Sequence, residues 1–296
     1  EIGSGLVGSE MCIRDRYQAR KNIIFLQHGV TAFKQCHKTY RKNCGNQMAL
    51  FVVTSEPEQK IIEKYFGYDK EEVIVTGFSR WDVLEDRSDP AHKEILLMPT
   101  WRNWLEDISE EAFRKSEYYQ RYETLLQDER LRTILERENI TLNFYIHAKF
   151  RERLGNFYTE DRHIRLIPFG TVPLNQLLMS CHMLITDYSS VSWEVYYQGK
   201  PVVFYPFDLE TYEKAHGSYV DYRKDVFGDL AWTEEELLDT IESYVKNNFQ
   251  EKPEYAKRRD TLLPYRDHNN SKRIYEAIVR AHIPSKLKKR RKDINF

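Results

Sequence analysis

The chain has 296 residues, of which 41% are hydrophobic and 31% are charged. This composition excludes a disordered chain, and the length allows one large or two ordinary globular domains. With a formal net charge of −1, the molecule has no overall attraction for nucleic acid. No apolar run approaches the roughly 20 residues of a membrane-spanning helix, so any membrane contact is predicted to be peripheral.

The two ends of the sequence differ from the part between them. Residues 1–16 resemble a translated adapter sequence and are predicted to be a non-native leader in front of a truncated N-terminal domain. Residues 286–292 read KLKKRRK, six basic residues and one leucine. This tail is either simply solvated or attracted to anionic lipid, at about 1 kcal/mol per basic side chain. Nucleic-acid binding is less favoured, because no recognisable module accompanies the tail.

The sequence predicts no bound metal and no cofactor. Four cysteines (Cys12, Cys36, Cys44 and Cys181) show no CxxC spacing, which is typical of reduced cytosolic thiols. The histidines show neither HxxxH nor HExxH spacing, and no cage of carboxylates for a divalent ion is evident.

From residue 21 onward, short apolar runs alternate with helical segments. Strands are predicted at residues 23–26, 49–54 and 73–76. Between the last two lies a helix that begins at Ser55, carries a proline and acidic residues in its first turn, and ends at Gly67. A polar, turn-prone linker follows at residues 85–90.

After the linker the alternation resumes. Strands are predicted at residues 95–98, 142–146, 164–167, 183–186 and 201–205, and helices at residues 110–138, 172–180 and 189–198. Strands separated by helices predict a parallel sheet covered on both faces. The sequence therefore predicts an α/β fold with two Rossmann-like domains facing a cleft, at residues 17–90 and 91–280, and a basic tail at residues 281–296.

Conspicuous polar motifs follow the predicted strands. Ligands of parallel α/β sheets bind beyond the carboxyl ends of the strands, so these motifs are expected to converge on one cleft. They are His28, the segment from Gly77 to Asp82, the segment from Thr100 to Arg102, His147, and the segment from Asp187 to Ser190.

The segment from Asp187 to Ser190 joins a strand to a helix. Backbone N–H groups at the helix start, with the hydroxyls of Ser189 and Ser190, would form an anion site. The alternative is that Asp187 or Ser189 only caps the helix. Glu194, one turn further on, faces either the cleft or solvent.

Histidine and arginine side chains supply the remaining candidates. His28 and His147 suit a base and a phosphate-contacting group, although a lone histidine is often structural. Thr100 and Arg102 offer a hydroxyl and a bidentate fork for a pyrophosphate. Arg80 is a second phosphate-binding candidate, or is paired with Asp82. No P-loop or GxSxG motif is present, and no GxGxxG motif follows any predicted strand.

Together, QHG, TGxxRxD, PTWR, a strand ending in histidine and the segment from Pro168 to Tyr212 resemble the CDP-glycerol:poly(glycerophosphate) glycerophosphotransferases, over roughly residues 21–280. The resemblance implies a GT-B fold and transfer of a polyol phosphate, CDP-glycerol being the expected donor. It also implies a lipid-linked polymer acceptor, release of CMP, and a peripheral location on the cytoplasmic face of the membrane.

The resemblance also implies roles for single residues. His28 would be the general base for the acceptor hydroxyl, His147 would contact the donor phosphates, and Asp187, Ser189 and Ser190 would lie beside the donor.

Three departures from the family pattern leave the polyol open between glycerol, ribitol and another alcohol. They are Ser79 in place of proline, Ala148 after His147, and His216 in place of arginine. Two other functions stay open: a GT-B nucleotide-sugar glycosyltransferase or epimerase, and a non-catalytic scaffold that binds polymer.

Overall fold

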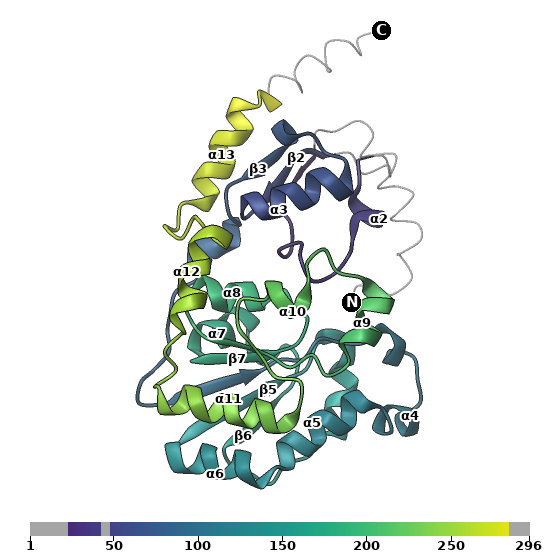
Figure 1. The fold of residues 1–296 in the computed structure, drawn as a ribbon, viewed down its shortest axis with the longest axis vertical. Helices are drawn as coiled ribbons and strands as arrows, with labels where there is room; N and C mark the ends of the chain where they lie inside the picture. Colours follow the sequence, from purple (N-terminus) through teal and green to yellow (C-terminus); the bar gives the residue numbers. More distant parts are fainter. Residues whose placement is uncertain (1–22, 43–47, 284–296) are drawn as a thin grey trace. The chain divides into compact units, whose positions relative to one another are not determined.

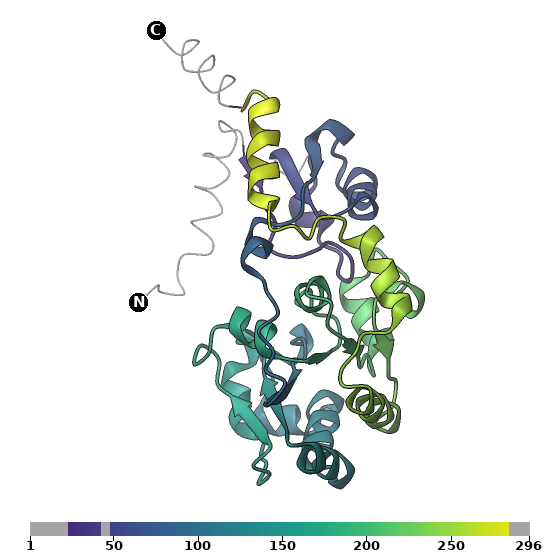
Figure 2. The same cartoon turned by 90° about the vertical axis from the view of Figure 1, so that its left-hand side faces the viewer.

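The computed structural model describes residues 23–42 and 48–283, which form two compact units, each built on a parallel sheet (Figures 1 and 2). The first unit contains residues up to Val83 and again from Asp260, and the second runs from Leu84 to Arg259. The predicted leader at residues 1–16, the basic run at residues 286–292, and Cys12 and Cys44 lie outside the described residues.

The first unit is built on a three-stranded parallel sheet of order β1-β2-β3. Its elements are β1 Ile23–Phe25, α2 His37–Tyr40, β2 Met48–Val53, α3 Glu56–Ile61, η1 Ile62–Phe66, η2 Lys70–Glu72, β3 Val73–Val75, η3 Ser79–Val83 and α13 Asn270–Arg280. The predicted start of α3 is confirmed, since the Ser55 hydroxyl accepts from the backbone N–H of Glu58. Gly67, at φ 74°, ends the helical stretch as predicted.

Helix α13 returns from the far end of the sequence to lie alongside the small sheet, as both views show (Figures 1 and 2). The Asp82 carboxylate accepts from the backbone N–H groups of Asn270 and Ser271, both at 2.8 Å, and so holds the start of the helix. Gly77, at φ 75°, packs directly against the Asn270 side chain, where a Cβ would clash. Burial opposes ionisation of Asp82, but the bonds from Ser271 and Asn270 outweigh it and lower its pKa.

The observed division of the chain differs from the predicted boundaries at residues 90/91 and 280/281. The linker belongs to the second unit from Leu84, because Asp86 pairs with Lys200 at 2.9 Å and the Arg87 N–H donates to the Met179 carbonyl. Residues after Arg259 belong to the first unit, because Asp82 anchors α13 there.

The second unit is built on a six-stranded, all-parallel sheet of order β6-β5-β4-β7-β8-β9. Its strands are β4 Lys93–Leu97, β5 Ile140–Tyr145, β6 Ile164–Ile167, β7 Met183–Thr186, β8 Val202–Phe204 and β9 Asp229–Leu230. Its helices are η4 Asn103–Leu105, α4 Glu110–Arg114, α5 Glu117–Gln127, α6 Glu129–Glu138, η5 Ala148–Asn156, α7 Leu174–Ser180, α8 Ser192–Tyr197, α9 Leu209–His216, α10 Tyr222–Asp225 and α11 Glu234–Lys246, and α12 Pro253–Leu262 leads out of the unit. Helices α5, α6 and α11 cover one face of the sheet, and α7 and α8 cover the other (Figure 1). All residues of β7 and β8 are therefore buried, as expected of a parallel sheet.

One long predicted helix proves to be three shorter ones. The stretch predicted at residues 110–138 is interrupted at Ser116 and Asp128, whose side chains cap the next helix by accepting from the N–H groups of Tyr119 and Leu131. The helices still bury one apolar face, so the periodicity was correct and only the breaks were missed. Within residues 23–42 and 48–283, no helix has the length and apolarity required to span a bilayer.

Candidate functional site

Four adjacent strands of the second unit end in polar loops at the same edge of the sheet. Strand β4 is followed by Thr100 and Arg102, β5 by His147, β7 by Asp187 and β8 by Asp208. Because neighbouring parallel strands end side by side, residues far apart in the sequence meet here.

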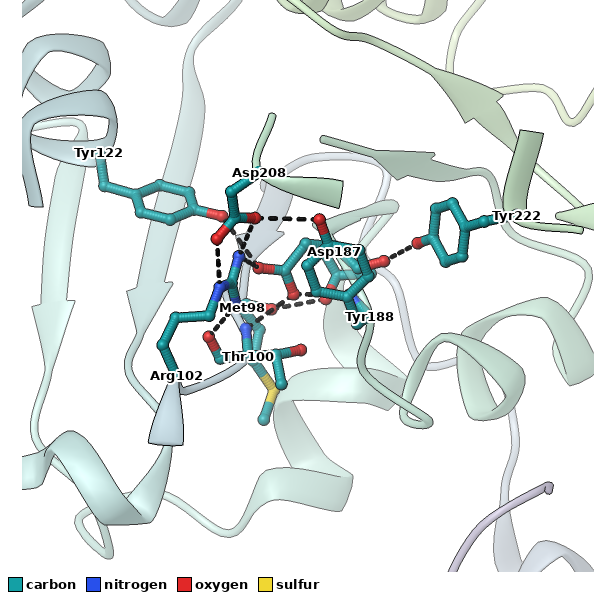
Figure 3. Close-up of polar contacts among 9 residues, drawn as sticks. Met98, Thr100, Arg102, Tyr122, Asp187, Tyr188, Asp208 and Tyr222 are labelled. Atoms are coloured by element: carbon teal, nitrogen blue, oxygen red, sulfur yellow. Dashed lines mark hydrogen bonds and ion pairs between the residues drawn. The ribbon is translucent and has the colours of Figure 1, made fainter. Parts of the chain in front are cut away.

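The centre of this edge is a buried ion cluster of one arginine and two aspartates (Figure 3). The Arg102 Nε and Nη2 donate to the two oxygens of Asp208 at 2.7 and 2.8 Å, and Nη2 pairs with Asp187 Oδ2 at 2.8 Å. The Arg102 Nη1 donates to the Thr100 carbonyl at 2.5 Å. The side chains of Arg102 and Asp187 are both 0% exposed. We call Arg102, Asp187 and Asp208 the Arg102 cluster.

Tyrosines complete the shell of the Arg102 cluster (Figure 3). Tyr188 donates to Asp208 Oδ1 at 2.9 Å, Tyr122 donates to Asp187 Oδ2 at 3.3 Å, and Tyr222 donates to the Asp187 carbonyl. Tyr188 and Tyr212 stack with their centroids 3.7 Å apart, and the Arg102 guanidinium lies 4.9 Å from the centre of the Tyr188 ring. Aromatic faces and carboxylates thus share the same buried cation.

Burial and charge set the ionisation of the cluster. Burial alone would lower the pKa of Arg102, but Asp187 and Asp208 hold that pKa well above its ordinary value. Burial, and next to it the charge of the carboxylates, raises the pKa of Tyr122 and Tyr188, so both remain hydroxyl donors at neutral pH. Arg102 therefore stays cationic, and the four carboxylate oxygens of Asp187 and Asp208 each accept at least one hydrogen bond.

Asp187 joins two loops rather than facing solvent. Its Oδ1 accepts from the backbone N–H of Thr100 at 2.8 Å and from that of Tyr188 at 2.6 Å. This fixes the loop after β4 to the loop after β7. The geometry favours a structural role for Arg102 and Asp187, and a direct contact between Arg102 and a pyrophosphate, as predicted from the sequence, would require Arg102 to leave its carboxylates.

The hydroxyl groups of Thr100, Ser189 and Ser190 differ in burial and in hydrogen bonding. The Thr100 hydroxyl is buried and has no hydrogen-bond partner among the described residues. Ser189 accepts from the N–H of Val191 at 3.4 Å, and its carbonyl accepts from Ser192, so this serine forms a turn in front of α8. The Ser190 side chain is half-buried and makes no hydrogen bond within the parts of the chain that the structure describes. Thr100 and Ser190 thus carry hydroxyls without a protein partner among the described residues, and that of Thr100 is closed off from solvent.

Helix α8 begins later than predicted, at Ser192 instead of Ser189, because residues 189–191 form the preceding turn. Glu194 is buried in the first turn of the helix. Glu194 was predicted to face either the cleft or solvent, and its burial agrees with neither.

His147 caps the helical segment η5 at the carboxyl end of β5. Its Nδ1 accepts from the backbone N–H of Lys149 at 3.2 Å, so the proton of the neutral ring is on Nε2. The His147 and Trp101 rings lie 6.0 Å apart, and Lys149 Nζ lies 5.6 Å from the Trp101 ring centre. A donor N–H, an indole and an ammonium group thus stand together after β4 and β5.

In the first unit, the positive charge of Arg80 acts on the His28 imidazole. His28 follows β1 and is exposed, whereas Arg80 lies in η3 with its guanidinium 4.5 Å from the centre of the Phe78 ring. Partial desolvation and the positive charges of Arg80 and Lys34 lower the pKa of His28. The neutral, proton-accepting imidazole is therefore favoured at physiological pH. The alternative pairing of Arg80 with Asp82 is not what holds Asp82, whose carboxylate binds the start of α13.

Asp208 and the tyrosines around the Arg102 cluster were not predicted from the sequence as site residues. Asp208 follows β8 as the other polar residues follow their strands, so the same rule would have selected it. Tyr122 lies inside a helix and carries no comparable signal. Among residues 23–42 and 48–283, no group of three or more His, Cys, Asp and Glu side chains is placed to hold a metal ion.

The sequence profile of the CDP-glycerol:poly(glycerophosphate) glycerophosphotransferase family matches residues 11–280. The chain belongs to this family. Relatives include the minor teichoic acid biosynthesis protein GgaB of Bacillus subtilis, 31% identical over 280 residues, which cover 91% of this chain and 30% of that protein. The teichoic acid ribitol-phosphate polymerase TarK of Staphylococcus aureus is 26% identical, over 90% of this chain and 53% of its own length. The chain thus spans a third to a half of these two family members.

Solved structures show the same fold. The wall teichoic acid polymerase TagF superposes with a TM-score of 0.64 at 17% identity, over 90% of this chain and 69% of that one. A putative UDP-N-acetylglucosamine 2-epimerase from Listeria monocytogenes superposes with a TM-score of 0.53 at 18% identity, over 92% of this chain and 71% of that one. The predicted GT-B-like α/β fold is confirmed.

Replacing Arg102 tests the structural role of the cluster. Arg102→Met leaves two buried carboxylates without a counter-charge and is expected to lower the free energy of unfolding by about 3–5 kcal/mol. Urea denaturation followed by circular dichroism measures the change. The matched control is Arg121→Met, which removes an exposed pair with Glu117 and should change stability by less than about 0.5 kcal/mol. Equal losses in the two variants would contradict the role assigned to Arg102.

Proposed function

We propose that this chain transfers glycerol phosphate, or a related polyol phosphate, from CDP-glycerol or its analogue to a membrane-linked surface polymer, with release of CMP. The observation that carries the proposal is the family match across residues 11–280. The relatives are named as teichoic acid primases, transferases and polymerases, and one TagF structure was obtained after a soak with CDPG. Both glycerol-phosphate and ribitol-phosphate enzymes are among them, so either polyol is compatible with the family.

The proposed reaction is an attack by an acceptor hydroxyl on the phosphorus that carries the glycerol. One O–P bond forms to the acceptor, and the bond between this phosphorus and the bridging oxygen of the pyrophosphate breaks. The bridging oxygen leaves with CMP, and the proton of the hydroxyl passes to a base. In this proposal His28 is the base, a role supported by its exposure and by a pKa lowered by partial desolvation and by Arg80 and Lys34.

The second unit would bind the donor. In the proposal, His147 donates from Nε2 to a phosphate oxygen, which is supported by the bond that its Nδ1 accepts from Lys149. The hydroxyls of Thr100 and Ser190 would donate to the donor as well, and Ser189 would lie next to them. Such contacts stabilise developing charge on the phosphates by pre-arranged donors.

The remaining predicted residues take supporting roles in this proposal. Arg102 and Asp187 would hold the loops after β4 and β7 in place, so that Thr100 and Ser190 keep a fixed position. Glu194, buried in α8, would act on the site only through that helix. Arg80 would act on the donor or on His28 through its charge. No metal or cofactor has a step in this scheme, since positioning and electrostatics carry phosphoryl transfer.

A sugar-nucleotide function has weaker support. The epimerase similarity is at 18% identity and therefore speaks for the shared fold only. An activity assay distinguishes the third function, a non-catalytic scaffold that binds polymer, because a scaffold would release no CMP from CDP-glycerol.

Substitution of the two histidines tests the catalytic assignment. His28→Ala and His147→Ala are each expected to lower the rate of CMP release from CDP-glycerol by about 100-fold or more, the usual contribution of a general base or a charge-stabilising donor. The assay is chromatographic detection of CMP with a membrane acceptor present. His92→Ala, at an exposed histidine paired with Asp89, is the control and should turn over like the parent. Parent-like rates in either site variant would refute its assigned role.

We also propose peripheral attachment to the inner face of the membrane through the basic residues 286–292. Six basic side chains near an anionic surface contribute roughly 1 kcal/mol each. Sedimentation with vesicles containing phosphatidylglycerol should show binding that weakens as salt rises, whereas vesicles of phosphatidylcholine alone should bind weakly. Equal binding by the intact chain and by a chain shortened before residue 286 would rule the attachment out.

A further inference from the structure

Glu58 is a buried carboxylate in the first unit whose hydrogen-bond donors are all neutral. It lies in the first turn of α3 and is 2% exposed. Its Oε1 accepts from the backbone N–H of Thr31 at 2.7 Å and from Gln27 Nε2 at 3.2 Å. Its Oε2 accepts from the N–H and the hydroxyl of Thr54 at 2.7 and 2.8 Å. Burial raises the pKa of Glu58, and the hydrogen bonds from Thr31, Thr54 and Gln27 counteract part of this effect. Burying a carboxylate without a cation is costly, so the groups that hydrogen-bond to it are informative.

Two of those groups bracket His28. Gln27 precedes the histidine, and Thr31 follows it three residues later. Gln27 has a φ of 58°, a left-handed conformation that a residue with a side chain adopts only when its surroundings enforce it. Its side chain is fixed at both ends, since Nε2 also donates to the Val52 carbonyl at 2.7 Å and Oε1 accepts from the Thr31 hydroxyl at 2.9 Å.

The same carboxylate connects two adjacent strands. Through Gln27 and Thr31 it holds the loop after β1, and through Thr54 it holds the residue that follows β2. The loop at residues 27–31 is therefore tied to the rigid start of α3 at both of its ends, while His28 itself is exposed between them.

We propose that Glu58 is a positioning residue that fixes the loop at residues 27–31 and thereby holds the His28 imidazole in the orientation needed for proton transfer. The inference rests on the proposed function in that it takes His28 to be the base. A displacement of about 1 Å at a reacting group can cost on the order of 100-fold in rate, so a tether of this kind has a catalytic consequence.

The four donors explain why a carboxylate is needed. Both oxygens of Glu58 face N–H or O–H groups, and only a carboxylate presents acceptors at both positions. The isosteric Glu58→Gln places an NH2 group against at least one of these donors. The tether is then broken with almost no change in side-chain volume.

The His28 ring reports the state of the loop. Its pKa is lowered first by partial desolvation and then by the positive charges of Arg80 and Lys34. A loop released from Glu58 exposes the ring further to water, so the pKa of His28 should rise toward its ordinary value. Gln27→Gly removes the Gln27 end of the tether without removing a charge and leaves the bond from the Thr31 N–H to Glu58. Glycine adopts the left-handed backbone freely, so this second variant is expected to fold.

The experiment compares Glu58→Gln and Gln27→Gly with Glu56→Gln, an exposed glutamate in the same turn of α3. The pKa of His28 is measured by NMR on histidine-labelled protein, with the signal assigned by its loss in His28→Ala. The kcat and KM for CMP release from CDP-glycerol are measured as a function of pH. In both tether variants we expect a raised pKa for His28, a matching shift in the acidic limb of the pH–rate profile, and kcat at least about tenfold lower with KM changed less than about twofold.

Unchanged His28 pKa and kcat in folded Glu58→Gln or Gln27→Gly would overturn the inference, and Gln27→Gly alone decides if Glu58→Gln does not fold. An effect of equal size in Glu56→Gln would also overturn it. Should His28→Ala turn over normally, the base assignment fails, and the pKa of His28 alone then decides whether Glu58 holds the loop.

Discussion

The ion cluster of Arg102 with Asp187 and Asp208 is the interaction on which the second unit depends. Two carboxylates and one guanidinium are removed from water, and each would cost several kcal/mol if it were left unpaired. Every oxygen of the carboxylates accepts a bond from the guanidinium, a backbone N–H or a tyrosine. Because the donors lie after β4 and β7 and in α5, and the acceptors Asp187 and Asp208 lie after β7 and β8, the cluster can form only when these three strand ends are in register. The cluster thereby holds the loops after these neighbouring strands in fixed positions relative to one another.

The first unit uses a related device without a cation. Glu58 holds the loop of His28 as Asp187 holds the loop of Thr100, in each case through backbone N–H groups that follow parallel strands. In both units the buried acid is separated from the candidate ligand-binding group by a short stretch of backbone. This division of labour fits a phosphotransferase, in which little covalent chemistry is required of the protein and the placement of donors and of a base decides the rate.

The sequence predicted the parts of this arrangement that depend on local pattern. The run of β7 is short, largely apolar and bounded by turns, so this strand was found correctly, with Asp187 directly after it. The breaks at Ser116 and Asp128 were missed because a helix cap resembles an ordinary polar position in an amphipathic stretch. Three features could not be predicted, because each depends on contacts between distant parts of the chain. They are the pairing of Arg102 with Asp208, the buried position of Glu194 and the return of α13 to the first unit.

The central claim is that a glycerol-bearing phosphorus is transferred, and phosphorus NMR of the reaction tests it most directly. With CDP-glycerol and a membrane acceptor, the account predicts that the pyrophosphate signals fall while equal amounts of a phosphodiester and of the phosphomonoester CMP appear. A glycosyltransferase would instead leave the nucleotide pyrophosphate intact and release a nucleoside diphosphate from a nucleotide sugar. Consumption of a UDP-sugar with unchanged CDP-polyol signals, in protein shown to be folded, would contradict the account.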